Sequence, residues 1–109
     1  MGSTTSEDKM KLVVTSDTTI NANVNTYYNS TSSSNVTLNL PQIEVGQEFV
    51  EGFIIYTEIS STKGVNIIQP TGVSVVYADG FDITEDGFWE INFLYNGNSW
   101  LVTGTKFNV

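Results

Sequence analysis

Four carboxylates within eight residues form the densest set of chemically active side chains in this sequence: Asp79, Asp82, Glu85 and Asp86. A hard cation such as Ca²⁺ takes roughly six to eight oxygen ligands, often from the carboxylates of one loop. The spacing does not follow the EF-hand pattern D-x-[DN]-x-[DN]-G. A carboxylate pair can also hydrolyse glycosides, but nothing in the sequence marks one of these groups as buried. We interpret the segment as a solvated acidic loop between strands, and we leave cation binding open.

The residue types that are missing exclude several classes of enzyme. The 109 residues include no His and no Cys, and all four cations are lysines: Lys9, Lys11, Lys63 and Lys106. A Ser-His-Asp triad, a thiol nucleophile and a typical structural zinc site are therefore excluded. A net charge of −8 argues against nucleic acid, because binding to nucleic acid depends on phosphate neutralisation by Lys and Arg. We expect no enzyme activity, no cofactor and no nucleic-acid partner, and we assign no residues to a metal site.

Three aromatic residues are candidates for ligand binding. Tyr27 and Tyr28 are adjacent, so in an extended segment they point to opposite sides, and one is expected beside a polar loop at 29–35. Trp100 follows a turn and either packs over its hairpin or presents its ring to a sugar. Exposed rings beside amides and hydroxyls have the composition of a glycan platform, although an ordinary β surface has the same composition.

The rest of the chain reads as β-strands separated by turns. Ala occurs only twice, and no window shows sustained helical spacing of apolar residues. Strands are predicted at 11–15, 18–24, 36–40, 48–59, 65–69, 73–77, 88–95 and 100–107. A turn is predicted at 44–47. The clearest unit is the hairpin 88–107, where Asn96-Gly97 separates two alternating segments.

This pattern predicts an all-β protein with about eight short strands, arranged as an antiparallel, jelly-roll-like β-sandwich. Residues 1–10 are expected to be a disordered leader or a cloning remnant, and residues 11–109 a single β-sandwich module. No stretch approaches the roughly 18 apolar residues of a membrane span, so no membrane insertion is expected. Ser, Thr and Asn make up a third of the chain, a composition that fits extracellular or virion-surface β proteins.

The longest apolar segment, 48–59, carries apolar side chains on both faces. The two sets are Phe49, Phe53 and Ile55 on one face, and Val50, Ile54 and Tyr56 on the other. A strand of this kind is either covered by a loop of its own chain or buried at a subunit interface. We therefore take Val50, Ile54 and Tyr56 as candidate oligomer-interface residues.

Three segments resemble bacteriophage tail-fibre and other virion-surface domains. They are the hairpin Phe88-Trp89-Glu90-Ile91-Asn92-Phe93-Leu94-Tyr95-Asn96-Gly97-Asn98-Ser99-Trp100, the segment Ile68-Gln69-Pro70-Thr71-Gly72-Val73, and Leu40-Pro41 followed by Val45-Gly46-Gln47-Glu48-Phe49. The resemblance implies an antiparallel β-sandwich assembled as a homotrimer on a fibre or spike. It also implies a location on the virion surface, with other virion proteins and a host surface glycan or protein as partners.

The function expected from these observations is a non-enzymatic structural and attachment module of a phage virion, with loops displayed for host recognition. The alternative is a monomeric carbohydrate-binding module of a secreted bacterial protein, which needs a coplanar strip of exposed rings. A third reading is a bacterial surface or adhesin domain. Oligomeric state separates the first reading from the second.

Overall fold

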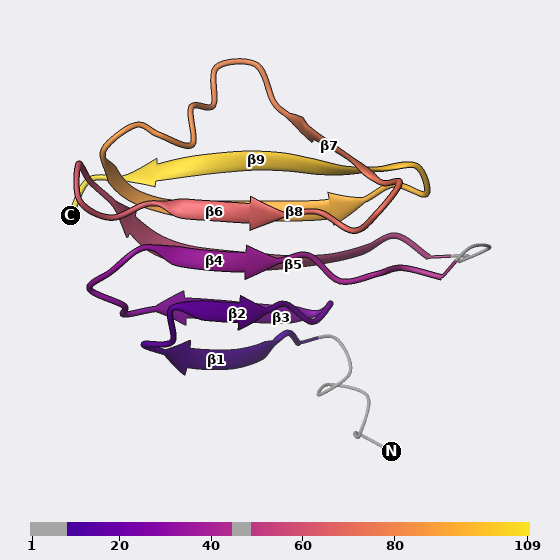
Figure 1. Cartoon of the computed structure of the whole chain (residues 1–109), viewed down its shortest axis with the longest axis horizontal. Helices are drawn as coiled ribbons and strands as arrows, with labels where there is room; N and C mark the ends of the chain where they lie inside the picture. Colours follow the sequence, from indigo (N-terminus) through magenta and orange to yellow (C-terminus); the bar gives the residue numbers. More distant parts are fainter. Residues whose placement is uncertain (1–8, 45–48) are drawn as a thin grey trace.

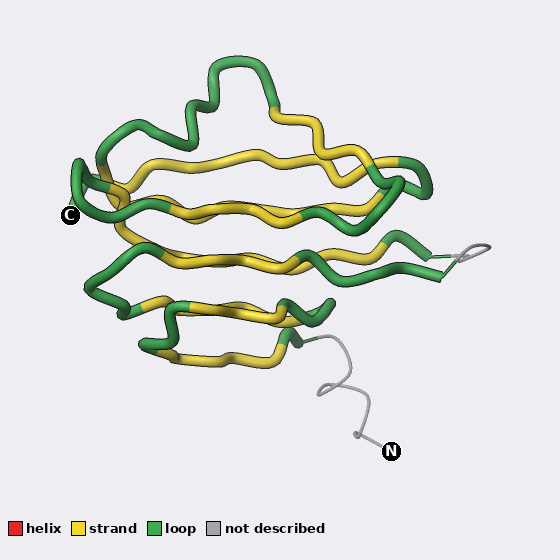
Figure 2. Tube along the Cα trace, in the orientation of Figure 1, coloured by secondary structure: helices red, strands yellow, loops and turns green. Residues whose placement is uncertain are grey.

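A computed structural model describes residues 9–44 and 49–109, and nine strands form within them. They are β1 (Lys11–Thr15), β2 (Thr19–Asn21), β3 (Thr26–Ser30), β4 (Val36–Asn39), β5 (Glu51–Ile59), β6 (Val65–Ile68), β7 (Ser74–Tyr77), β8 (Gly87–Tyr95) and β9 (Ser99–Phe107). The described residues contain no helix (Figure 2), so the expected all-β class is confirmed. The first eight residues of the expected leader, and most of the turn expected at 44–47, lie outside the described residues.

The strands form two sheets that lie one in front of the other (Figure 1). Sheet A has six strands in the order β1-β3-β5-β8-β9-β7, and sheet B has three in the order β2-β4-β6. Buried residues of both sheets belong to one hydrophobic cluster, so a single core lies between them. Sheet B covers only half the width of sheet A, and the remaining core needs another cover.

The expectation of purely antiparallel pairing is wrong. Five of the seven strand pairings are parallel, and only β5–β8 and β8–β9 are antiparallel. From β1 to β6 the chain places alternate strands in sheet A and sheet B, and thereby makes three coils of a solenoid. Successive strands within one sheet therefore run in the same direction. Alternation of apolar residues fixes which face is buried but carries no information about strand direction.

The core is built around a cluster of aromatic rings from neighbouring strands of sheet A. Phe53 of β5 stacks on Phe93 of β8 with ring centroids 4.6 Å apart, and it meets the edges of Tyr28 and Trp100 at 6.1 and 5.7 Å. Val36 and Leu38 of sheet B are fully buried in the same core cluster.

The C-terminal hairpin forms as predicted. β8 pairs with β9 from Phe88 opposite Phe107 to Tyr95 opposite Trp100. In the turn Gly97 has a φ of 96°, and the Asn96 side-chain oxygen accepts hydrogen bonds from the N–H groups of Asn98 and Ser99.

Two predicted segments nearer the N-terminus have different bounds in the structure. The strand predicted at 18–24 is shorter and corresponds to β2. The predicted polar loop 29–35 begins later than expected, because β3 extends to Ser30.

The loop 78–86 covers the core beyond the edge of sheet B. Phe81 lies over the backbone of Gly104 in β9, and its ring centroid is 5.1 Å from that of Trp89. A Cβ atom on Gly104 would come within 2.4 Å of the Phe81 ring. Ile83 also packs against the core. Because Gly104 has no side chain, the Phe81 ring can cover the part of the core that sheet B does not reach.

Replacing Gly104 with Ala is expected to lower the free energy of unfolding by about 1–3 kcal/mol, the usual cost of overpacking a core. The physical reason is that the added methyl group would push the Phe81 ring away from the Gly104 backbone. Urea unfolding followed by tryptophan fluorescence measures the change. Gly64→Ala is the matched control, because its nearest neighbour would lie 4.0 Å away, and it should have little effect. Equal effects of the two substitutions would contradict the seating of Phe81.

Candidate functional site

The outward face of sheet B is polar. Its solvent-facing side chains are Thr19, Asn21, Thr37, Asn39, Asn66 and Ile68. The side-chain amide of Asn39 donates to the Asn21 side-chain oxygen at 2.8 Å, so these amides form a short ladder across the parallel strands. This face has the hydroxyl and amide composition that the whole sequence displays.

The outward face of sheet A is apolar by contrast. We call apolar face the outward-facing set Leu12, Val14, Ile54, Tyr56, Val76, Phe88, Leu94, Leu101 and Phe107. It extends across all strands of the sheet except β3, whose outward residues are Tyr27 and Asn29. Asn92, Thr103 and Thr105 lie among these side chains on the same face. Large sets of exposed apolar side chains are typical of interaction sites.

Aromatic rings gather at one end of the apolar face. Tyr56 stacks against Phe88 with centroids 6.4 Å apart, and Phe107 meets Tyr56 edge-on at 6.1 Å. Phe107 remains 42% exposed although it belongs to this cluster. The rings are therefore held in place by one another while one side of the cluster faces solvent.

Of the acidic residues that the structure describes, two lie on this face, and both have partners. The Glu58 carboxylate is 3.8 Å from the Lys63 ammonium. The Tyr27 hydroxyl donates to Glu90 Oε2 at 2.7 Å. Because Tyr27 is on β3 and Glu90 on β8, this bond crosses over β5. Burial, followed by the bond to Glu90, raises the pKa of Tyr27 to about 12.

The predicted interface residues are placed as follows. Ile54 and Tyr56 are half-buried on the apolar face. Phe53 and Ile55, which point to the opposite side of β5, are in the core, as the periodicity predicted. Val50 precedes β5 and is 61% exposed. Phe49, which was assigned to the core side of this segment, is 76% exposed and lies outside the strand, so that part of the prediction is wrong.

The three predicted ligand-binding rings lie in different environments: one is on the outward side of sheet A, and two are in the core. Tyr27 is half-buried on the outward side of β3. Tyr28 is in the core, where its hydroxyl accepts a hydrogen bond from the Asn23 N–H at 2.8 Å. Trp100 is fully buried between Phe53 and Tyr95. Assigning Tyr28 and Trp100 to a binding surface is therefore corrected, because neither ring presents a face to solvent.

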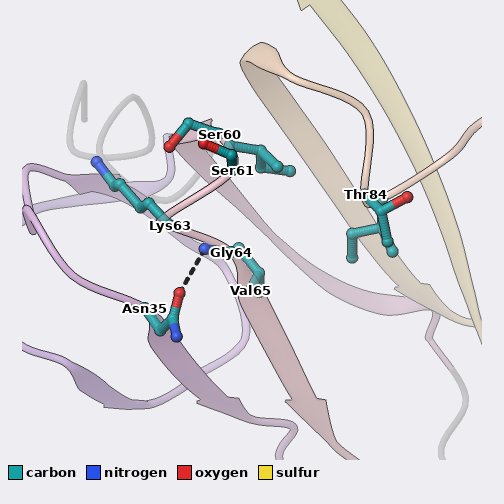
Figure 3. A pocket seen from close by; sticks show the side chains of 9 residues that line it. Asn35, Ser60, Ser61, Lys63, Gly64, Val65 and Thr84 are labelled. Atoms are coloured by element: carbon teal, nitrogen blue, oxygen red, sulfur yellow. Dashed lines mark hydrogen bonds between the residues drawn. The ribbon is translucent and has the colours of Figure 1, made fainter.

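A pocket of about 260 Å³ lies between the β5–β6 turn and the loop 78–86. Figure 3 shows Ser60 and Ser61 on one side of it and Thr84 on the other, with the Lys63 ammonium pointing away from Thr84. The Asn35 side-chain oxygen accepts a hydrogen bond from the Gly64 N–H at 2.8 Å, so this oxygen already has a partner within the chain. The pocket thus contains hydroxyls but no charged groups that converge on a reacting atom.

A second hollow of about 260 Å³ opens beside the apolar face at Gly52. Ile54, Asn92 and Leu94 line it together with the Gly52 backbone. A Cβ atom on Gly52 would lie 2.6 Å from the Phe93 carbonyl oxygen, so the position accepts only glycine without a shift.

The acidic residues of the loop 78–86 act separately. The Asp82 carboxylate accepts bonds from the Thr84 hydroxyl at 2.6 Å and the Thr84 N–H at 2.9 Å, and these bonds lower its pKa. Glu85 pairs with the Lys106 ammonium at 2.9 Å. Within residues 9–44 and 49–109, no group of three or more acidic side chains is placed to hold a metal ion.

Comparison with protein-family models, curated proteins and solved structures finds no match to this chain. The part of the chain that the structure describes includes no helix long and apolar enough to cross a membrane.

Sequence reasoning missed most of the apolar face. Leu12 and Val14 were recognised only as members of a short strand, and Phe88 and Phe107 only as hairpin residues. The alternation that assigned Trp89, Ile91 and Phe93 to the core also places Phe88 and Leu94 on the opposite side. The sequence of β8 therefore indicates that Phe88 and Leu94 point away from the core. It does not indicate the strand order that places them beside Ile54.

The Tyr27–Glu90 bond predicts a late-titrating tyrosine. The phenol keeps its proton in the folded chain up to about pH 12 and loses it near pH 10 in the unfolded chain, so folding stability falls as pH rises through this window. Absorbance titration near 295 nm should show one tyrosine ionising near pH 12, and Tyr27→Phe should remove that step. Glu90→Gln should move it to lower pH. An unchanged titration curve in both variants would contradict the bond.

Proposed function

We propose that this protein is a non-enzymatic structural and attachment module of a bacteriophage virion, in a tail fibre, head fibre or spike. The subunit is a two-layer β-sandwich, and copies assemble as a homotrimer through the apolar face. The loops away from that face are displayed for recognition of a host surface glycan or protein. The resemblance of the hairpin 88–100 to virion-surface domains supports the phage origin and the number of subunits.

The observation that carries the proposal is the difference between the two outward faces. Sheet B presents amides and hydroxyls, whereas sheet A presents aliphatic and aromatic side chains. A monomer gains nothing from an exposed apolar sheet face and risks aggregation. A symmetric assembly removes this face from water in every copy.

We take further copies of this chain as the molecules that cover the apolar face, because this face carries few of the chain's charges. The chain has 12 acidic residues and a net charge of −8, so copies repel one another in general. Among the described residues, the apolar face holds two of these acids: Glu58 lies beside the Lys63 ammonium, whereas Glu90 is hydrogen-bonded to the uncharged Tyr27 hydroxyl. The hollow at Gly52 offers a seat for an apolar side chain of a neighbouring copy.

A monomeric carbohydrate-binding module has less support. That function needs exposed rings in one plane, and Tyr28 and Trp100 are in the core. On the apolar face, Tyr56, Phe88 and Phe107 are arranged as a mutual cluster that contains an edge-on contact. The exposed rings of Phe49 and Tyr77 lie outside this cluster.

Sedimentation velocity at micromolar concentration is expected to give three times the 12.0 kDa chain mass. Ile54→Lys should convert the protein to a folded monomer, because it buries a charge at the centre of the interface. Thr37→Lys is the matched control, since it places the same charge on the central strand of the outward face of sheet B, and it should leave the oligomer intact. A monomeric parent protein would remove the main support for the proposal.

A further inference from the structure

We propose that neighbouring copies join strand to strand, with the free edge of β1 in one copy pairing in parallel with the free edge of β7 in the next. The apolar faces of three copies then line the inside of a closed three-sided prism. This inference rests on the proposed homotrimer and goes beyond it by naming the contact that closes the ring.

β1 is an uncovered edge of sheet A within the described residues. The Lys11 N–H donates to the Asn25 carbonyl and the Thr31 N–H to the Thr15 carbonyl, so alternate residues of β1 bond to β3. The backbone groups of Leu12 and Val14 consequently point away from the sheet. Their side chains are 64% and 61% exposed. An edge strand that is apolar and has no proline or bulge is a template for pairing with another chain.

β7 is the opposite edge of sheet A and has the same character. The Ala78 N–H donates to the Val102 carbonyl, so the backbone groups of Ser74, Val76 and Ala78 face β9. Those of Val75 and Tyr77 face outward. The Val76 side chain is on the apolar face and is 49% exposed. Figure 1 shows β1 and β7 at opposite margins of the molecule.

Strand direction is compatible with closure around an axis that runs along the strands. β1, β3 and β5 are parallel, β8 is antiparallel to β5 and to β9, and β7 is parallel to β9. β1 and β7 therefore run in the same direction. Rotation about an axis along the strands preserves strand direction, so β1 of one copy meets β7 of the next as a parallel pair. Such a contact is heterologous and closes into a ring.

The free backbone groups place Val76 opposite either Leu12 or Val14, and the proposed register is the one in which Val76 lies opposite Leu12. The Leu12 N–H donates to the Val75 carbonyl, the Tyr77 N–H donates to the Leu12 carbonyl, and the Val14 N–H donates to the Tyr77 carbonyl. Leu12 then lies directly opposite Val76, and both side chains are on the apolar face. Val13 lies opposite Tyr77 on the other side of the sheet. The contact therefore extends the apolar face across the subunit boundary.

The size of the sheet suits a three-sided prism. Six strands at about 4.8 Å spacing give each copy a side of about 29 Å, which leaves about 8 Å between the middle of each sheet and the axis. Sheets packed face to face need only about 5 Å each. The middle strands β5 and β8 direct Ile54, Tyr56 and Phe88 into this space, together with the polar side chains of Glu58, Glu90 and Asn92.

Disulfide cross-linking between introduced cysteines tests this contact directly, because the parent chain has no cysteine of its own. In Leu12→Cys with Val76→Cys, the two cysteines are on opposite edges of one chain but adjacent across the proposed contact. Adjacent strands hold Cα atoms within the roughly 4.4–6.8 Å range that a disulfide accepts. Mild oxidation should yield a covalent trimer on a non-reducing gel, and reduction should restore the monomer band.

Two controls make the outcome decisive. Leu12→Cys alone and Val76→Cys alone should give no cross-link, since identical residues are at different corners of the prism. Leu12→Cys with Val14→Cys tests the competing two-fold arrangement, in which two β1 strands pair antiparallel, and a covalent dimer of that variant would overturn the proposal. A trimeric parent protein in which neither a Leu12/Val76 nor a Val14/Val76 pair of cysteines cross-links would overturn the edge contact alone, and a cross-link of the Val14/Val76 pair only would overturn the register. A monomeric parent would overturn the assembly as well.

A proline pair gives a second readout that needs no oxidation. Val14→Pro removes an N–H that the single chain does not use, whereas Val13→Pro removes one that bonds to β3. Val14→Pro should therefore dissociate the trimer at micromolar concentration with the β-type circular dichroism retained. Val13→Pro should lower the unfolding temperature of the subunit itself. A Val14→Pro protein that remains trimeric would contradict the contact.

Discussion

The packing of Phe53 is the interaction on which the rest of the structure depends. Its ring stacks on Phe93 and meets Tyr28 and Trp100 edge-on, so one side chain of β5 joins β3, β8 and β9. Truncating a buried phenylalanine typically costs about 3–5 kcal/mol, a large share of the stability of a small domain. The chain has no disulfide to compensate for such a loss. β5 must therefore occupy the middle of sheet A, with a parallel neighbour on one side and an antiparallel neighbour on the other.

Placing β5 there has a consequence for the surface. Its alternate residues Ile54 and Tyr56 point away from the core, and the neighbouring β8 adds Phe88 and Leu94 to the same side. Sheet B covers the inner face of the sheet and leaves this outer one free. An aromatic cluster, a hollow at Gly52 and two paired carboxylates are thus assembled on a sheet face that a single subunit does not cover. The core and the proposed assembly surface are two sides of the same strands.

Much of the local structure could be predicted from particular residues. Asn96-Gly97 between two alternating segments predicted the hairpin, since Gly97 takes a positive φ at no steric cost. The periodicity of 48–59 separated Phe53 from Ile54 correctly, but it failed at Phe49, where the strand has not yet begun. Tyr28 and Trp100 were offered as binding rings because local sequence does not show which side of a strand is covered. The parallel direction of β1 to β6 could not be read at all, because alternation is the same in parallel and antiparallel strands.

The sequence by itself determined that the protein is all-β, that it has no His, Cys or Arg for catalysis, and that one of its strands is apolar on both faces. Composition and alternation are local properties, and they suffice for these conclusions. Only the tertiary structure decided that Leu12, Ile54, Phe88 and Val76 share one face, and that β1 and β7 are free edges with the same direction. Those facts depend on strand order. Strand order is set by contacts between residues distant in sequence, chiefly the burial of the rings around Phe53.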